Sequence, residues 1–348
     1  MSKIIFFDST LRDGSHAIKH QLTKENIKEY CAAIDDAGME VVIVGHGYGL
    51  GASTLQAGFS LLEDYEMLCL AKQYLKKTKL GVFVAPGFAT IKNNIKPAIK
   101  LGVDVFCVAA HCTEADITQQ HIEFINKNNK EVYGVLMMYH MTSKEKLLEE
   151  AQKMQKYGVK GIVIMDSAGA STLEMIEETV EYLVDNLNIS VGFHPHNNLG
   201  LGVVGAYIAI KNGATIIDGT LRGFGAGAGN CQLEALIALL KKRKYKLSVN
   251  LYKILDISEN IVSRFTNKDK GISSLSIISG MNAVVSTFGP PVLSASKKFE
   301  VDSRDIFEEL GKRKVVACQE DVIIEVAEKL QRLRKEQNSD LAEIESLF

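Results

Sequence analysis

A series of short apolar segments constrains the fold of this chain more than any other feature. The segments recur roughly every 20 to 30 residues, and stretches with helical periodicity separate them. Most of them are hydrophobic without interruption, which is typical of parallel strands that are buried on both faces. We therefore expect eight parallel strands, at residues 4–8, 41–45, 80–84, 105–109, 132–138, 161–165, 190–194 and 216–220.

The alternation of strands and helices predicts the architecture. Eight strand and helix pairs within about 240 residues match a (β/α)8 TIM barrel, in which chemistry takes place at the C-terminal ends of the strands. A doubly wound open sheet is the alternative, but no Gly-x-Gly-x-x-Gly turn follows the first strand. The expected helix at 24–37 has both boundary signals, Thr23 as the N-cap and Gly38 beyond its end, and a helix at 143–156 has similar ones.

The pattern changes after the basic run at 241–244. Residues 250–336 have the periodicity of helices, which glycine and proline separate, and no further strand is expected among them. We therefore divide this α/β chain into a catalytic TIM-barrel domain at 1–245 and a smaller helical C-terminal domain at 246–348. The second domain is a candidate docking region for a partner protein.

Charge and hydropathy exclude several classes of function. The 348 residues carry 40 Lys and Arg against 42 Asp and Glu, so nothing predicts nucleic acid or an anionic membrane as a partner. No apolar run approaches the ~20 residues of a membrane-spanning helix, and the N-terminus lacks the regions of a signal peptide. The six cysteines form no Cys-x-x-Cys pair. We expect a cytoplasmic protein without a disulfide framework.

Ionisable side chains gather at the ends of two strands. Residues 8–16 follow the first strand and contain two carboxylates, one guanidinium and one imidazole, and the seventh strand ends in His194 and His196. Two residues apart in an extended chain, these histidines point the same way and suit one bound cation, although histidines of an ordinary core are an equally common reason for this pattern. Asp13 is the best candidate for a third ligand, and such a set suits Mn, Mg, Co or Zn.

Several motifs resemble a known group of enzymes. Three of them are similar to the HMG-CoA lyase-like superfamily, the metal-dependent pyruvate aldolases and acyl-CoA lyases and synthases that share a TIM barrel and a DRE-type signature: Asp8-Ser9-Thr10-Leu11-Arg12-Asp13-Gly14, Gly192-Phe193-His194-Pro195-His196-Asn197-Asn198 and Gly225-Ala226-Gly227-Ala228-Gly229-Asn230. Four more resemble the 4-hydroxy-2-oxovalerate aldolase family within it: Arg12-Asp13-Gly14-Ser15-His16-Ala17, His111-Cys112-Thr113-Glu114-Ala115-Asp116, Asp166-Ser167-Ala168-Gly169-Ala170 and Cys318-Gln319-Glu320-Asp321.

The resemblance implies a class II aldolase. Such an enzyme cleaves a 4-hydroxy-2-oxo acid, for example 4-hydroxy-2-oxovalerate, to pyruvate and an aldehyde through an enolate that a divalent metal stabilises. It implies that Asp13, His194 and His196 hold the metal, usually Mn²⁺. It also implies that Arg12 stabilises the enolate oxygen and that His16 accepts and returns the proton of the 4-hydroxyl.

Three further residues are carried over from the family. Ser167 would help to seat the carboxylate of pyruvate, next to Arg12 and His194, which would also contact the substrate. Asn230 would lie near the metal, and His20 could orient His16.

Two residues depart from the family's pattern. The family usually has His-Gly-Asp-Gly after strand 2, where this chain has Tyr48 at the third position, and it commonly has a tyrosine beside the substrate's 4-position, where this chain has Val285. Both differences bear on which aldehyde is released and on its stereochemistry, unless Tyr48 is a surface loop residue and Val285 is ordinary helix packing.

Other chemistries remain open at this point. A Claisen lyase or synthase that uses acyl-CoA would share the metal ligands, and a homologue acting on a sugar-derived keto acid would keep the whole site. A Schiff base is disfavoured because Lys3, Lys79 and Lys160 precede strands instead of ending them.

The resemblance also implies partners. A small keto acid is the expected substrate, and the family typically pairs with an acylating aldehyde dehydrogenase through such a helical region. We therefore expect a homo-oligomer or a hetero-oligomer, with a role in aromatic hydrocarbon catabolism or in sugar metabolism.

Overall fold

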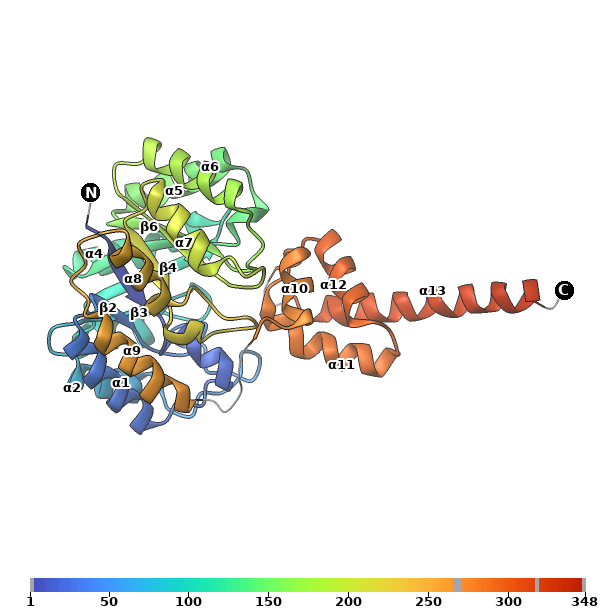
Figure 1. The fold of residues 1–348 in the computed structure, drawn as a ribbon, viewed down its shortest axis with the longest axis horizontal. Coiled ribbons are helices and arrows are strands. Elements are labelled where there is room, and N and C mark those ends of the chain that lie inside the picture. The colour runs from blue at the N-terminus through green and yellow to red at the C-terminus, as the bar shows by residue number, and fades with distance from the viewer. Residues whose placement is uncertain (1–2, 266–270, 317–318, 346–348) are drawn as a thin grey trace.

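The computed structural model describes residues 3–265, 271–316 and 319–345, with side chains as far as residue 336. Figure 1 shows a rounded barrel surrounded by helices and a helical region beside it. The last helix begins within the helical region, and its far end extends away from the rest of the molecule (Figure 1). Cys318, the first residue of one motif named above, lies outside the described residues.

Eight parallel strands close into a barrel in chain order. The strand β1 pairs with β2 on one side and with β8 on the other, where Ile5 faces Ile216 and Asp8 faces Gly219. This closure confirms the TIM barrel and excludes the open doubly wound sheet. The strands are β1 (Ile5–Asp8), β2 (Val41–Ile43), β3 (Lys79–Val84), β4 (Val105–His111), β5 (Glu131–Met137), β6 (Gly161–Asp166), β7 (Ser190–Pro195) and β8 (Ile216–Gly219).

Helices follow the strands and cover the outside of the barrel (Figure 1). They are α1 (Lys24–Ala37), α2 (Asp64–Tyr74), α3 (Lys96–Leu101), α4 (Gln119–Lys127), α5 (Lys144–Tyr157), α6 (Leu173–Asn186), α7 (Gly202–Lys211) and α8 (Leu233–Lys242). The expected cap of α1 is confirmed, because Thr23 and Asn26 form a reciprocal capping box and Gly38 ends the helix with a φ of 79°.

Side chains alternate between the two faces of each strand. In β4, Val105, Cys107 and Ala109 fill the inside of the barrel, while Phe106 and Val108 pack beneath the surrounding helices. Both faces are therefore buried, which is the physical reason why these strands have no polar alternation in the sequence.

A helical region follows the barrel. It consists of α10 (Ser274–Met281), α11 (Gly289–Phe299), α12 (Ser303–Lys312) and α13 (Asp321–Glu345), which share a core around Phe288 and Phe307. Met138, at the end of β5, packs into this core, so the region is joined to the mouth of the barrel. The helix α9 (Leu251–Asn260) comes before it and buries Ile254 and Ile257 in the barrel core. The division of the chain at residue 245 stays a prediction.

The described residues bear on two other expectations. None of their helices combines the length and the apolar character that crossing a bilayer requires. Within the same part of the chain, the cysteines that the structure describes are free: Cys31, Cys69, Cys107, Cys112 and Cys231.

Candidate active site

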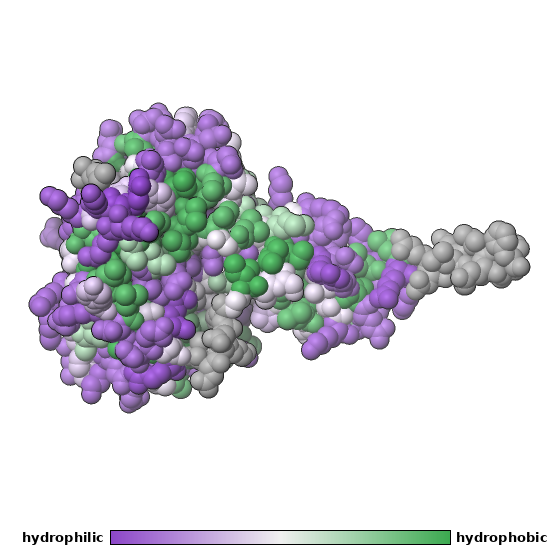
Figure 2. Space-filling view, viewed as in Figure 1, coloured by the Kyte–Doolittle hydropathy of each residue, from purple (hydrophilic) through white to green (hydrophobic). Residues whose placement is uncertain are grey.

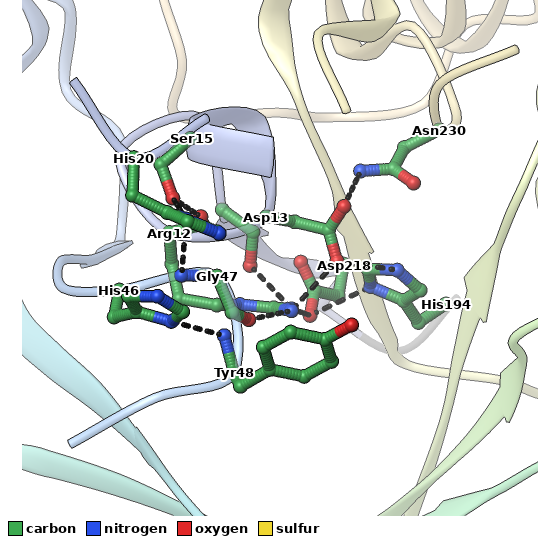
Figure 3. A network of polar contacts seen from close by, with 11 residues as sticks. Arg12, Asp13, Ser15, His20, His46, Gly47, Tyr48, His194, Asp218 and Asn230 are labelled. Carbon is green, nitrogen blue, oxygen red and sulfur yellow. Dashed lines mark hydrogen bonds and ion pairs between the residues drawn. The ribbon is translucent and has the colours of Figure 1, made fainter. Parts of the chain in front are cut away.

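Arg12, Asp13 and His194, three of the ionisable side chains singled out in the sequence, lie close together (Figure 3). After β1 the chain turns into a short 3-10 helix (Asp13–Ile18), and Arg12 and Asp13 lie at its start. On the neighbouring side of the barrel, His194 belongs to β7 and His196 follows it. His196 forms an isolated β-bridge with Asn230, which fixes the glycine-rich loop after β8 beside the two histidines.

Asp13, His194 and His196 form a compact buried cluster. One potential ligand atom from each lies within 4.8 Å of the others. The Nε2 atom of His194 is 3.8 Å from Asp13 Oδ2. In the described part of the chain, the Nε2 of His194 and the Nδ1 of His196 have no hydrogen-bond partner. Buried polar atoms are normally paired, so these nitrogens fit a cation bound among the three side chains.

The Arg12 guanidinium is buried between two carboxylates. Its NH1 atom lies 2.6 Å from Asp13 Oδ2, and its NH2 atom lies 3.6 Å from Asp218 Oδ2. NH2 also donates to the Ser9 hydroxyl at 3.3 Å, and NH1 to the Gly47 carbonyl at 3.3 Å. These contacts hold the positive charge in one place beside the cluster, as an electrostatic stabiliser requires.

Asp218 is a part of the site that the sequence analysis missed. It lies on β8 between β1 and β7, and its Oδ2 is 2.9 Å from His194 Nδ1. A signal was present in the sequence, because a carboxylate two residues after the inward-facing Ile216 of a buried strand must point into the barrel.

Charge and burial set the protonation of the cluster. Burial alone would raise the pKa of Asp13, but the Arg12 guanidinium and the facing histidines outweigh it, and the pKa lies well below its ordinary value. Burial lowers the pKa of His196 to about 4, although the Asp13 charge opposes this shift. Near pH 7 Asp13 is therefore ionised and His196 is neutral, and these are the forms that bind metals.

Three imidazoles and a phenol gather beside Arg12. The ring of His16 meets those of His20 and Tyr48 edge to face, with centroids 4.9 Å and 4.7 Å away. The His20 ring stacks on that of His46 at 3.6 Å. Among the described residues no hydrogen bond joins His16 to His20, so any orienting effect of His20 acts through packing.

The environment of His16 keeps its ring neutral. Burial lowers the pKa of His16 to about 4, and it lowers that of His20 to about 3. A β-carbon at Gly47 would clash with the His16 ring, so the glycine is needed for this close approach. A neutral imidazole can accept a proton from a substrate near pH 7.

A cavity of about 440 Å³ opens over these groups. Arg12, Asp13, His16 and His196 line one part of it, and Ser167 lines it as well. The hydroxyl of Ser167 accepts a hydrogen bond from the Met138 amide at 3.1 Å. Most of the other lining side chains are apolar, among them Phe83, Ala85, Phe88, Ile117, Met137 and Val285.

A second cavity of about 760 Å³ lies between the barrel mouth and the helical region. The two cavities share lining residues, including His16, Tyr48 and Ser286. Tyr48 and Val285, the two departures from the family pattern, thus both face the interior space next to the site.

Comparison with known proteins adds to this geometry. Residues 3–261 match the family described as HMGL-like, and residues 271–332 match the DmpG-like communication domain. The chain therefore belongs to the HMGL-like family and has a C-terminal domain of the communication type.

The similarity to individual proteins is closer. The 4-hydroxy-2-oxovalerate aldolase of Pectobacterium atrosepticum is 51% identical over 94% of this chain and 96% of its own length, and that of Spirochaeta aurantia is 46% identical over the same shares. Within its family the chain thus belongs with the 4-hydroxy-2-oxovalerate aldolases, which are carbon-carbon lyases. The carboxyl transferase domain of Rhizobium etli pyruvate carboxylase shares the fold, with a TM-score of 0.77 at 14% identity over 94% of this chain and 60% of that one.

Proposed function

We propose that this aldolase depends on a divalent metal and cleaves a 4-hydroxy-2-oxo acid, such as 4-hydroxy-2-oxovalerate, to pyruvate and an aldehyde. One observation carries the proposal: the buried cluster of Asp13, His194 and His196 lies beside the fixed Arg12 charge at the wall of a cavity. The names of the similar enzymes support the substrate class.

The three side chains of the cluster would hold the metal. Two imidazoles and a carboxylate suit Mn²⁺, with Mg²⁺, Co²⁺ or Zn²⁺ as alternatives. When bound, such an ion would act as a Lewis acid that draws electrons toward the 2-keto oxygen of the substrate. Asn230 donates to Asp13 Oδ1 at 3.0 Å, which leaves Oδ2 directed toward His194. Asn230 would therefore orient a ligand.

The remaining residues of the site would move the proton and stabilise the charge. His16 accepts the proton of the 4-hydroxyl, and the bond between C3 and C4 breaks. The electron pair of that bond forms an enolate, whose negative charge lies on the 2-keto oxygen. Arg12 stabilises that negative charge. Ser167 and Arg12, with His194, seat the pyruvyl group. Protonation at C3 then yields pyruvate.

The apolar part of the cavity would receive the aldehyde side of the substrate. Its lining by Phe88, Ile117 and Val285 favours an uncharged alkyl tail over one that ends in a carboxylate. Tyr48 lies on the same wall and would limit the shape of the tail.

The helical region would dock an acylating aldehyde dehydrogenase. The communication-domain match supports this role. Figure 2 shows hydrophobic surface where the helical region meets the barrel. Apolar side chains of α10 and α11 are exposed, including Ile277, Met281 and Leu293, and such surface is typical of interfaces. We further propose a hetero-oligomer in the cytoplasm that serves aromatic hydrocarbon catabolism.

One experiment tests the main proposal. Purified protein stripped of metal is incubated with Mn²⁺ and a panel of 4-hydroxy-2-oxo acids, and pyruvate is followed. We expect pyruvate only when metal is present. Metal analysis of His194→Ala protein is the companion measurement, and a metal content equal to that of the wild type would contradict the assigned ligands.

A further inference from the structure

Asp218 is a buried carboxylate at the centre of the site, yet the proposed reaction gives it no step. In β8 the side chain of Ile216 belongs to the inside of the barrel and that of Ile217 to the outer core, so Asp218 points inward again. It is only 4% exposed. An isolated charge in such a place is very costly, so its neighbours must compensate for it.

Asp218 lies close to two groups of the reaction site, the His194 imidazole and the Arg12 guanidinium. Asp218 Oδ2 lies 2.9 Å from His194 Nδ1 and 3.6 Å from Arg12 NH2. Figure 3 shows Asp218 between these two side chains. Its other oxygen, Oδ1, is buried and has no hydrogen-bond partner within the described residues. One oxygen of the carboxylate, Oδ2, therefore faces both His194, a proposed metal ligand, and Arg12, which would stabilise the enolate.

The two nitrogens of His194 face different groups. Nε2 is 3.8 Å from Asp13 Oδ2, on the side of the proposed metal, while Nδ1 faces Asp218. The contact at Nδ1 is short, although it is not aligned as a hydrogen bond. A negative charge at this place favours the proton on Nδ1, and the lone pair is then on Nε2, where a metal can use it.

We propose that Asp218 is a positioning residue: it selects the tautomer of His194 that can bind the metal, and it holds the second nitrogen of Arg12. This inference rests on the proposed metal-dependent function. A carboxylate with a purely structural role looks different in this protein. Asp35, for example, accepts hydrogen bonds from three consecutive backbone amides, at residues 76–78, and touches no residue of the site.

The test is the affinity for Mn²⁺ in Asp218→Asn, measured from the spectroscopic signal of free Mn²⁺ during titration. The amide keeps the shape but removes the charge, and its NH₂ group would favour the opposite tautomer of His194. We expect 10- to 100-fold weaker Mn²⁺ binding, the usual cost of losing a carboxylate partner of a metal-bound histidine. Asp35→Asn is the matched control, and its affinity should equal that of the wild type.

The other outcomes are distinct. If the wild type binds neither Mn²⁺ nor any of the alternatives Mg²⁺, Co²⁺ and Zn²⁺, the proposed function itself fails. If the wild type binds Mn²⁺ and Asp218→Asn binds it equally well, only the role of Asp218 is overturned. At saturating Mn²⁺ the kcat of Asp218→Asn should remain about 10-fold below that of the wild type, because the carboxylate that holds the second nitrogen of Arg12 is gone. A kcat equal to that of the wild type would overturn the proposal that Asp218 positions Arg12.

A second variant covers a failure to fold. Asp218→Ser leaves room for water in place of the carboxylate and should show the same loss of Mn²⁺ affinity. If neither variant reaches the circular dichroism of the wild type, the inference is overturned, because Asp218 would then support the barrel and not the site.

Discussion

The charge of Arg12 is held in place before any substrate arrives. Asp13, Ser9 and the Gly47 carbonyl fix its guanidinium from three directions. A group that is already oriented costs little reorganisation when negative charge develops in the transition state. Its effect should therefore appear in the rate of the chemical step more than in substrate binding.

We expect Arg12→Ala to lower kcat by at least ~10²-fold, the scale of losing one oxyanion donor. Steady-state kinetics with metal at saturation measures this change. Arg222→Ala is the matched control, since Arg222 is partly exposed and pairs with Glu259 outside the cavity. A change confined to KM would contradict the role of Arg12.

His16 gives a second prediction, because its neutral ring suits a base for the 4-hydroxyl. We expect His16→Ala to lose cleavage by ~10²- to 10⁴-fold, the usual contribution of a positioned acid-base group. Exchange of the methyl protons of pyruvate does not involve the 4-hydroxyl and should persist. His121→Ala serves as the control, since its ring bonds to the Ala89 carbonyl on the outside of the barrel.

Near-normal cleavage by metal-loaded His16→Ala enzyme would mean that another group takes the hydroxyl proton. Loss of both cleavage and bound metal would mean that the substitution has disturbed Asp13, three residues away. Metal analysis of the same preparation separates these two results.

At the scale of elements, one amide links the segment after β7 to the helical region. Asn198 is fully buried, and its Nδ2 lies 3.1 Å from the Ser276 carbonyl, 3.3 Å from the Ser279 hydroxyl and 2.7 Å from the Ser286 hydroxyl. Because Asn198 is two residues from His196, this contact couples the position of α10 to the cluster of Asp13, His194 and His196.

Loss of this contact should loosen α10 from the barrel. We expect Asn198→Ala to lower the free energy of unfolding by ~1 to 3 kcal/mol, since buried hydroxyl and carbonyl groups lose their donor. Urea denaturation measures the loss, and hydrogen exchange of α10 shows where it acts. Asn212→Ala removes only a local bond at the end of α7 and is the control. Unchanged exchange in α10 would contradict the coupling.

The elements themselves could be predicted closely from the sequence. Strands buried on both faces leave a short, continuous hydrophobic signal in the sequence, and the strand expected at 216–220 is observed at Ile216–Gly219. The ends of the strands were predicted less closely. The strand β2 ends at Ile43 and not at residue 45, because beyond Ile43 the backbone makes one more hydrogen bond to β3, from the Val44 amide to the Gly81 carbonyl, and then leaves the sheet.

The site was predictable where local spacing carries the information. His194 and His196 share a strand end, so their spacing alone brings them together. Asp218 was missed because its importance depends on two residues that are far away in sequence, Arg12 in the segment after β1 and His194 on β7. The stacking of His20 on His46 was missed for the same reason, since the approach of two loops decides it.

At the scale of the whole molecule, several buried groups change their protonation on unfolding. The folded pKa values of His16, His20 and His196 lie at about 4, 3 and 4, below the ordinary 6.5, because burial disfavours the charged ring. Burial raises the folded pKa of Asp8 to about 6. Between pH 6.5 and 4 the unfolded chain thus binds three protons at these histidines that the folded chain excludes, while Asp8 offsets one of them.

The sign of the pH effect follows from this balance. Stability rises with pH wherever the unfolded state binds more protons. The contribution of the histidines to the free energy of unfolding is complete above pH 6.5 and is lost as the pH falls toward 4. The contribution of Asp8 is complete below pH 3.8 and is lost as the pH rises through 6. Three groups outweigh one, so the protein should lose stability on acidification.

We expect the free energy of unfolding, measured by urea denaturation with a chelator present, to fall by ~3 to 5 kcal/mol between pH 7 and pH 5. The chelator removes any metal, so only protons change. His196→Gln replaces one titrating ring by a neutral side chain and should reduce the fall by ~2 kcal/mol, which is nearly half of it because Asp8 offsets part of the histidine total. An equal free energy of unfolding at both pH values would show that the folded barrel does not hold these histidines neutral. A fall in His196→Gln as large as that of the wild type would show the same for His196.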